Sequence, residues 1–374
     1  MTTFPKFSIY MPMVNGYHIT KLTLDSLIDN IGFSFNKFII IASGTTDGMC
    51  HSILRHIREE GYRGVPKEKF KVIILPSEQA IDFARSMNVA IRMLDPDEDM
   101  FFVENNTLFG RNFMTPIIEN AYFKKYSNDV FMLCHFSALQ NNFKLHEAYD
   151  LEVRPFFKLG VSPEQGLLLI HDFFKRHSEM NKDFNELSIQ MSYLFQNQGD
   201  SSSFSEGAYI KRSCFNQVGF LDEQFPSGGN ETDYTIRINN LNKIILCVKS
   251  SVYLHIAYGI TSRRDDKQEV LMVEGGERLA QKYDLRQKKV VKTQHGFEIT
   301  QQPVMKDQDY VMVGQEKLSL HHNVLQHLGA VPWHPLYNTT LPMRQLLEKA
   351  GFTVKENSPI AKAFPLMTPE KSLS

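Results

Sequence analysis

The sequence predicts an α/β protein built on a mixed, mostly parallel sheet flanked by helices. The stretches Phe7–Val14, Lys37–Ala42 and Phe70–Leu75 are short, β-rich and largely apolar, and segments with helical spacing alternate with them. Wholly apolar strands that alternate with helices are typical of a parallel sheet covered on both faces. The 374 residues suffice for one large domain and an appendage, and we expect a domain at 1–262 and a smaller C-terminal region at 263–374.

Composition and charge are those of a globular protein without an overall electrostatic field. Hydrophobic residues make up 42% and charged residues 22% of the chain, and the net charge is −1, so no general attraction of polyanions is expected. The four cysteines are far apart, which argues against a zinc site or a disulfide framework. Without a signal-like start or an apolar run of about 18 residues, we expect a soluble, cytoplasmic protein with no membrane span, in the host cytoplasm if viral.

The N-terminal elements follow one another in a regular order. The first strand, Phe7–Val14, contains Pro12 and is closed by the turn Asn15-Gly16. Apolar residues then recur at helical spacing over His18–Ile31. The next elements are expected to be strand Lys37–Ala42, loop 43–48, helix Cys50–Glu60, strand Phe70–Leu75, helix Gln79–Leu94, strand Met100–Val103, helix Phe113–Tyr126 and strand Asp129–His135.

Polar side chains follow three of these strands where each strand ends. Asn15 follows the first, the loop SGTTDG at 43–48 follows the second, and the triplet Glu104-Asn105-Asn106 follows the fourth. Ligands of such sheets bind beyond the carboxyl ends of the strands. The sequence therefore places polar chemistry where the topology predicts a cleft.

The second half of the chain is organised around the stretch 207–255. Residues 162–196 have a helical pattern, 197–205 are expected to form a flexible loop, and 207–255 carry a glycine-containing loop, several acids and a strand ending at His255. Beyond a boundary near 258–266 we expect helices at 268–283 and 343–350. The other notable residues there have no partners at recognisable spacing: His321, His322, Trp333, His334 and the basic run Arg286, Lys288, Lys289 and Lys292.

Four segments in order resemble the family 2 glycosyltransferases with the GT-A fold, over about residues 7–262. FSIYMPMVNGYHITKLTLDSLI is similar to the strand, turn and helix that begin the nucleotide-sugar site, and FIIIASGTTDGM to the second strand and its D-[DN]-G-S-x-D-G loop. FFVENNTLFGRNFMTPIIENA resembles the metal-binding D-x-D segment. VGFLDEQFPSGGNETDYTIRI followed by VYLH resembles the acceptor loop with its E-D-x-D motif and the late metal-ligand histidine.

The resemblance implies a divalent metal, Mn²⁺ or Mg²⁺, held by Glu104, Asn106 and His255. A nucleoside-diphosphate sugar has a diphosphate leaving group whose developing charge needs a cation, and hard oxygen ligands with an imidazole suit such a metal. An amide oxygen adds no charge, so this site should bind metal more weakly than one with two aspartates. The alternative is that Glu104-Asn105-Asn106 is a solvated strand end and His255 a core histidine.

The resemblance also implies an inverting transfer in which one carboxylate takes the proton of the acceptor hydroxyl. By motif position Glu231 is the base and Asp233 positions the acceptor or the loop, which Gly228 and Gly229 make flexible. The alternative is a solvated first helical turn, where acids are favourable, with Asp233 and Arg237 forming an ordinary helical ion pair.

Donor contacts and departures from the family pattern complete the predicted site. Ala42 stands where the family has an aspartate that binds the nucleotide base, and Asn106 and Asn230 stand where it has acids. Base recognition is therefore expected to be altered, with Ser43 or Asp47 as the alternative contacts. The residues expected to contact the donor are Pro12, Asn15, Ser43, Asp47, Arg85, Asn88 and Asn105.

The acceptor and the oligomeric state stay open at the level of the sequence. A saccharide or glycoconjugate is the family's usual acceptor class. A hydroxymethylated base of phage DNA is an alternative, and the basic run would then be a candidate contact to the phosphate backbone. A third alternative is a non-catalytic binding protein that kept the fold after losing acids.

Overall fold

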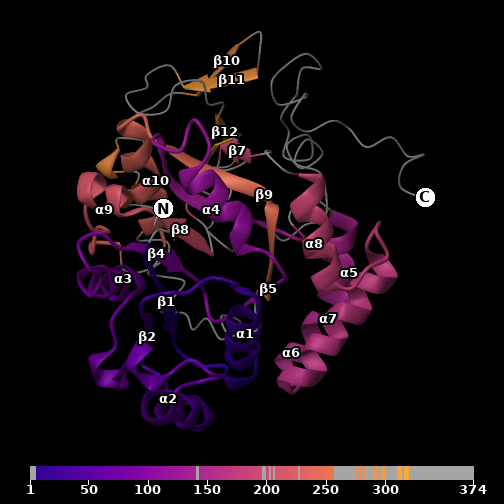
Figure 1. Ribbon diagram of the computed structural model, residues 1–374. Coiled ribbons are helices and arrows are strands. Elements are labelled where there is room, and N and C mark those ends of the chain that lie inside the picture. The colour runs from indigo at the N-terminus through magenta and orange to yellow at the C-terminus, as the bar shows by residue number, and fades with distance from the viewer. Residues whose placement is uncertain are drawn as a thin grey trace.

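The computed structural model of the chain describes most of the first 256 residues and a small part of the remainder. The described residues are 6–139, 143–195, 199–201, 204, 207–225, 228–256, 275, 278–279 and 281–283, with the backbone of four short strands between 290 and 319. Figure 1 shows a central sheet with helices around it.

A mixed sheet of nine strands forms the centre of the protein. The strands are β1 Phe7–Met13, β2 Phe38–Ser43, β3 Phe70–Leu75, β4 Asp99–Phe102, β5 Thr107–Phe109, β6 Val130–Ser137, β7 Gly199–Ser201, β8 Ala208–Ile210 and β9 Ile244–His255. Their order is β3-β2-β1-β4-β8-β6-β9-β5, and β7 pairs with β9 beside this path. The strands β5, β7 and β8 run antiparallel to their neighbours, whereas the other six share one direction. The predicted α/β class, with a mixed and mostly parallel sheet, is confirmed.

Both faces of the sheet are covered because side chains alternate along its strands. Ile9 and Met11 of β1 enter one apolar core and Tyr10 enters the other, as the two-residue period of a strand requires. The first core is completed by helices α1 Tyr17–Asn30, α2 Gly48–Glu60 and α4 Met114–Tyr122. The second core is completed by α3 Phe83–Arg92, α9 Arg212–Val218 and α10 Asn230–Asn240.

Four further helices form a layer of their own at the right of Figure 1: α5 Phe143–Glu152, α6 Arg154–Lys158, α7 Pro163–His177 and α8 Phe184–Leu194. Their apolar core also takes in Ile19 of α1 and Leu254 and Ile256 at the end of β9. The close approach of α8 depends on Gly110, since a Cβ built there would lie 2.3 Å from the Cβ of Ser188. This helical layer therefore packs beside the part of β9 that ends at His255.

Three predicted segments differ from the structure. The helix expected over 79–94 begins at Phe83, because Asp82 caps it by accepting a hydrogen bond from the Arg85 N–H at 2.9 Å. The helical stretch expected over 162–196 is divided into α7 and α8, and Asn181 lies between them with a left-handed φ of 48°.

The third difference concerns the loop expected over 197–205. Its residues Gly199–Ser201 form β7 and pair antiparallel with β9, so the prediction of a flexible loop is wrong there. The main chain supplies these hydrogen bonds, which is why the polar side chains of this segment did not indicate a strand.

Much of the predicted C-terminal region lies outside the described residues. This applies to the boundary at 258–266, to the side chains of His321, His322, Trp333, His334 and the basic run, and to the helix expected over 343–350. The described residues 275, 278–279 and 281–282 are helical, as expected for 268–283. Two antiparallel pairs follow, β10 Val290–Thr293 with β11 Gly296–Ile299, and β12 Tyr310–Val313 with β13 Glu316–Ser319. In the part of the chain that the structure describes, every helix is too short or too polar to cross a membrane.

Candidate active site

The turns after β1 and β2 are joined by the side chain of Asn15. Its Oδ1 accepts hydrogen bonds from the backbone N–H groups of Thr46 and Asp47, at 2.9 and 3.0 Å, and its Nδ2 donates to Thr46 Oγ1 at 3.2 Å. The two predicted polar strand ends therefore lie together. The amide of Asn15 is used within the protein, and a donor contact by this residue stays a prediction.

Asp47 caps helix α2 and also holds the start of α1. Its Oδ1 accepts from the N–H groups of Met49 and Cys50, at 2.9 and 3.4 Å, and its Oδ2 accepts from the Tyr17 N–H at 3.3 Å. Burial raises the pKa of Asp47, but hydrogen bonds from Cys50, Tyr17 and Met49 outweigh it and leave the pKa below its usual value. The ionised carboxylate is therefore stabilised at the carboxyl edge of the sheet.

The end of β2 is fixed by Ser43, whose Oγ donates to Ile81 O and accepts from Ile81 N, both at 2.7 Å. Ala42 has no exposed surface and belongs to the core. The next hydroxyl that could contact a ligand is Thr45 Oγ1, which is buried and has no partner among the described residues. Thr45 could not be singled out from the sequence, because nothing in the SGTTDG loop distinguishes one hydroxyl from the next.

Helix α3 carries the two predicted donor contacts Arg85 and Asn88 in different environments. The side chain of Arg85 is 55% exposed, and its Nε lies 3.5 Å from Asp82 Oδ2 and 3.8 Å from Glu223 Oε2. Asn88 is buried and exchanges hydrogen bonds with the backbone of Leu221, donating to its carbonyl at 3.0 Å and accepting from its N–H at 2.9 Å. Asn88 therefore connects α3 to the loop that precedes α10.

The three predicted metal ligands converge at the ends of β4 and β9. The Nε2 atom of His255 lies 3.2 Å from Glu104 Oε2 and 3.0 Å from Asn106 Nδ2. Antiparallel pairing of β5 with β9 sets this geometry, because it places Thr107 opposite His255, and the Ile256 N–H donates to Asn106 O at 2.8 Å.

The Nε2 atom of His255 thus faces one hydrogen-bond acceptor, the Glu104 carboxylate, and one hydrogen-bond donor, the Asn106 amide nitrogen. A protonated Nε2 would donate to the Glu104 carboxylate, whereas a bare Nε2 would accept from the Asn106 amide. The cluster is compatible with a cation in the place of that proton.

The chemistry of the donor set fits a divalent cation held by three ligands. Asn106 Oδ1 is buried and accepts no hydrogen bond from the described residues, so this oxygen is available to a cation. Among the described residues no three His, Cys, Asp or Glu side chains are grouped so that they could hold a metal, so a cation bound here would have the amide oxygen of Asn106 as its third protein ligand. Next to them, Asn105 donates to Asn15 O and Thr20 Oγ1, at 3.2 and 2.9 Å.

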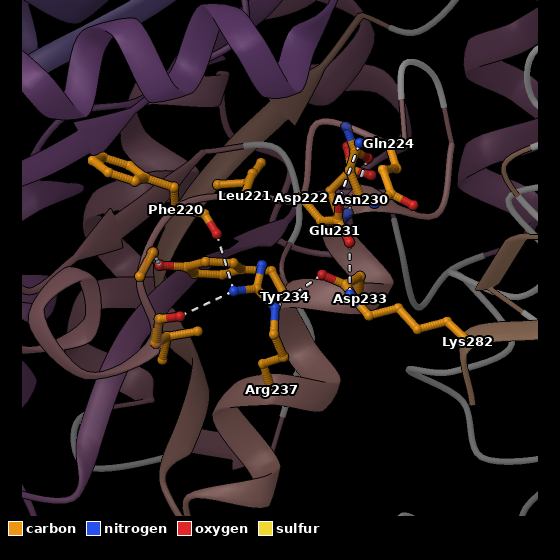
Figure 2. Close-up of polar contacts among 12 residues, drawn as sticks. Phe220, Leu221, Asp222, Gln224, Asn230, Glu231, Asp233, Tyr234, Arg237 and Lys282 are labelled. Atoms are coloured by element: carbon orange, nitrogen blue, oxygen red, sulfur yellow. Dashed lines mark hydrogen bonds and ion pairs between the residues drawn. The ribbon is translucent and has the colours of Figure 1, made fainter.

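The predicted acids lie in the first turn of α10, after a left-handed Gly229 with φ of 82°. Glu231 is partly buried, and its N–H donates to Asn230 Oδ1 at 2.9 Å. Asp233 has no exposed surface, so the alternative of a solvated first turn is wrong for this residue. The ion pair with Arg237 is present, with Nε to Oδ2 at 2.9 Å, and Figure 2 shows Arg237 reaching back toward Asp233 and Phe220.

Aromatic rings connect the acid-bearing helix to the sheet. The ring of Phe204 lies 5.6 Å from that of Phe102 in β4 and 6.1 Å from that of Tyr234 in α10, measured between centroids. Its N–H donates to Thr235 Oγ1 at 3.0 Å. Helix α10 is therefore packed on the strand that leads to Glu104.

No protein-family model and no curated protein matches the sequence. Among solved structures, the chain is similar to the mannosyltransferase PcManGT from Pyrobaculum calidifontis in complex with GDP-Man and Mn²⁺, with 12% identity and a TM-score of 0.45 over 76% of this chain and 64% of that one. It is also similar to GalNAc-T7 with UDP, GalNAc and Mn²⁺, with 10% identity and a TM-score of 0.46 over 74% of this chain and 48% of that one. Both are glycosyltransferases of the GT-A type, the class that the sequence motifs resemble. The chain spans less than two thirds of the length of either one.

Proposed function

We propose that the protein is an inverting glycosyltransferase that moves a sugar from a nucleoside-diphosphate sugar to an acceptor hydroxyl. The observation that carries the proposal is the grouping of Glu104, Asn106 and His255 at the carboxyl edge of the sheet. His255 Nε2 lies 3.2 Å from Glu104 Oε2 and 3.0 Å from Asn106 Nδ2. The sequence motifs predicted this group from segments about 150 residues apart. An arrangement of one carboxylate, one amide oxygen and one imidazole suits Mn²⁺ or Mg²⁺.

When bound, the metal would neutralise charge that develops on the diphosphate leaving group. Glu104, Asn106 and His255 would hold it, and the chain's other groups would bind and orient the donor. Arg85 is exposed enough to reach a phosphate, while Ser43, Asp47 and Asn88 act by fixing the loops around the donor. Pro12, Asn15 and Asn105 would line the same edge of the sheet, and the burial of Ala42 supports base recognition by another group.

Glu231 is the proposed base. The acceptor oxygen bonds to the anomeric carbon as the bond from that carbon to the diphosphate oxygen breaks, and the electron pair leaves with the diphosphate. The proton of the acceptor hydroxyl passes to the Glu231 carboxylate. A single carboxylate on the acceptor side is what one inverting displacement requires. Asp233 is less suited to this role because both of its oxygens accept hydrogen bonds within the protein.

The proposed acceptor is a saccharide or glycoconjugate, and the proposed location is the cytoplasm.

The proposal is tested by titrating the full chain with a panel of nucleoside-diphosphate sugars by calorimetry, with and without Mn²⁺. Turnover is then assayed with simple glycosides and with hydroxymethylated duplex DNA. We expect Mn²⁺-enhanced binding of one donor and transfer to the glycosides. Transfer to the DNA alone would replace the acceptor class, and binding without transfer or hydrolysis would support the non-catalytic alternative. Absence of both binding and turnover across the panel would refute the transferase.

A further inference from the structure

The carboxylate of Asp233 is held by two residues that lie beyond the predicted end of the domain at 262. Its Oδ1 accepts from Lys282 Nζ at 2.6 Å and from Tyr283 Oη at 2.7 Å. Burial and the hydrogen bond to Asp233 raise the pKa of Tyr283, which keeps its hydroxyl a donor. The chain therefore returns, after residues 257–274, to the helix that carries Glu231.

Lys282 connects the loop before α10 to the first turn of α10. The same Nζ lies 2.8 Å from Asp222 Oδ2, so it bridges the loop before α10 and the first turn of α10 (Figure 2). Arg237 reinforces this connection, since it binds Asp233 through Nε and donates through Nη1 to Val218 O and Phe220 O, each at 3.0 Å. The positive charges of Lys282 and Arg237 thus neutralise the negative charges of Asp222 and the buried Asp233.

Apolar packing closes the same contact. Leu279 is 1% exposed and shares a small core with Phe225 and Ile236, and Tyr283 packs against it. A Cβ built on Gly229 would lie 3.1 Å from Gly275 O. Gly275 therefore packs against Gly229, and Leu279 and Tyr283 pack against α10 and the loop that precedes it.

The backbone that leads into α10 is formed by two glycines, and the helix lacks a side-chain cap. Gly228 and Gly229 both have left-handed φ angles, 76° and 82°, and α10 has no side-chain cap hydrogen bond. A base must stay within hydrogen-bond distance of the acceptor hydroxyl. The first turn, which carries Glu231, consequently depends on the contacts of Asp233 two residues later.

We propose that Lys282 and Tyr283 are positioning residues that hold Glu231 in place through Asp233, so that the segment 275–283 completes the acceptor side of the site. The proposal rests on the proposed function. Neither residue touches the reacting atoms. Sequence analysis missed both, because a lysine followed by a tyrosine in a helical stretch beyond the motifs carries no signal.

The test uses the full chain with Lys282→Met, which keeps the length of the side chain but removes its charge, and Tyr283→Phe, which removes one hydroxyl. Since small misplacements of a catalytic group are costly, we expect kcat to fall by ~10²-fold in Lys282→Met and by ~10-fold in Tyr283→Phe. The donor Kd from calorimetry should change by less than about twofold, because the donor side of the site is untouched. Lys282→Arg should restore most of kcat.

Lys243→Met is the matched control, because Lys243 also forms an ion pair, with Asp129 at 3.0 Å, and its side chain is 24% exposed against 35% for Lys282. It should leave kcat unchanged. Hydrogen exchange supplies a readout that does not need activity: amides of 229–237 should exchange ~10-fold faster in Lys282→Met, as expected for a local opening, while those of α1 remain protected.

Unchanged kcat and unchanged exchange in Lys282→Met, or equal losses in Lys243→Met, would overturn the proposal. If Lys282→Met fails to fold, Tyr283→Phe decides by the same two measurements. If the wild-type chain shows neither donor binding nor turnover, the proposed function fails, and the exchange experiment still decides whether residues 282 and 283 hold the first turn of α10.

Discussion

At the scale of single residues, Asn106 is the proposed ligand that is expected to limit how strongly the candidate cluster binds a cation. Its Oδ1 is buried without a partner among the described residues and belongs to a group with only one carboxylate, Glu104. Replacing the amide by a carboxylate adds a charged ligand of nearly the same size. Asn106→Asp should therefore tighten Mn²⁺ binding by ~10-fold, a change of about 1.4 kcal/mol, as measured by calorimetry without donor.

Asn105→Asp is the control for this substitution. It adds the same charge one residue away, but it removes the donor that Asn105 gives to Asn15 O and Thr20 Oγ1. We expect it to leave Mn²⁺ affinity within about threefold of wild type, because the charge does not replace a ligand. Equal tightening in both variants would mean that position 106 is not a ligand.

Glu231 is the residue on which the proposed chemistry depends. Glu231→Gln keeps the size of the side chain and its position in the first turn of α10 but cannot accept a proton. We expect kcat to fall by ~10²-fold or more with donor affinity nearly unchanged, from initial rates and calorimetry. Glu186→Gln, a first-turn acid of α8, should keep full activity. Full activity in Glu231→Gln would move the base elsewhere.

How much of the site could be predicted depended on where each residue lies. Glu104 follows a strand with a strong apolar pattern, so that strand end could be predicted from the sequence, whereas the grouping of Glu104 and Asn106 with His255 was predicted from the resemblance to the family's motifs. The setting of Asp233 could not be, because its partners Lys282 and Tyr283 come from a segment without a motif. Asn88 shows the same limit: its hydrogen bonds to Leu221 link residues 133 positions apart.

At the scale of elements, the helical layer approaches the sheet most tightly where α8 passes Gly110. A Cβ at Gly110 would lie 2.3 Å from Ser188 Cβ and 2.6 Å from its Oγ. Gly110→Ala should therefore push α8 away and lower the free energy of unfolding by about 1–3 kcal/mol, measured by urea denaturation. Gly48→Ala is the control, because no atom lies within 4 Å of a Cβ there, and it should change stability by less than about 0.5 kcal/mol.

The elements that the sequence did not reveal are the shortest ones. The strands β5, β7 and β8 have three residues each, which is too short to show a two-residue period. All three pair antiparallel with strands distant in sequence, so their existence is decided by tertiary contacts. The strands β1 and β2 were predictable because they are buried over almost their whole length and are therefore mostly apolar, and β3 was predictable from its apolar composition although only Phe70 of this strand is buried.

At the scale of the whole molecule, a histidine without a partner for its second nitrogen lies inside the core. His135 is surrounded by the rings of Phe101, Phe109 and Phe113, and its Nδ1 lies 2.5 Å from Ser251 Oγ. Ser251 Oγ donates to Phe113 O, so His135 Nδ1–H is the donor in the first bond. Its Nε2 is buried and has no partner among the described residues, and burial lowers the pKa of His135 to about 3.

This histidine makes folding sensitive to acid. Below about pH 6.5 His135 is protonated in the unfolded chain, whereas in the folded chain it stays neutral down to about pH 3. The free energy of unfolding therefore decreases as the pH falls through this range, with a slope approaching about 1.4 kcal/mol per pH unit. We expect His135→Phe, which cannot titrate, to lose this contribution. Urea denaturation of both chains between pH 7 and pH 5 measures the difference.

Wild type must be compared with His135→Phe because Asp99 changes the pH dependence of stability in the opposite direction. Burial raises its pKa to about 6, so the folded state binds a proton there before the unfolded state does, and stability gains as the pH falls through 6. Asp99 is present in both chains and cancels in the difference. Parallel pH dependences in wild type and His135→Phe would show that His135 does not remain neutral in the folded protein.

The contact between Asp233 and residues 282 and 283 has a practical consequence for dividing the protein. The motifs end at residue 262, and a piece cut there would remove Lys282, which leaves Arg237 as the cation that pairs with the buried carboxylate of Asp233 among the described residues, and would uncover Phe225 and Ile236. In such a piece the buried negative charge of Asp233 would lose its contacts with Lys282 and Tyr283. This loss would destabilise the turn that carries Glu231. A fragment intended for testing the proposed activity should therefore extend at least to Tyr283.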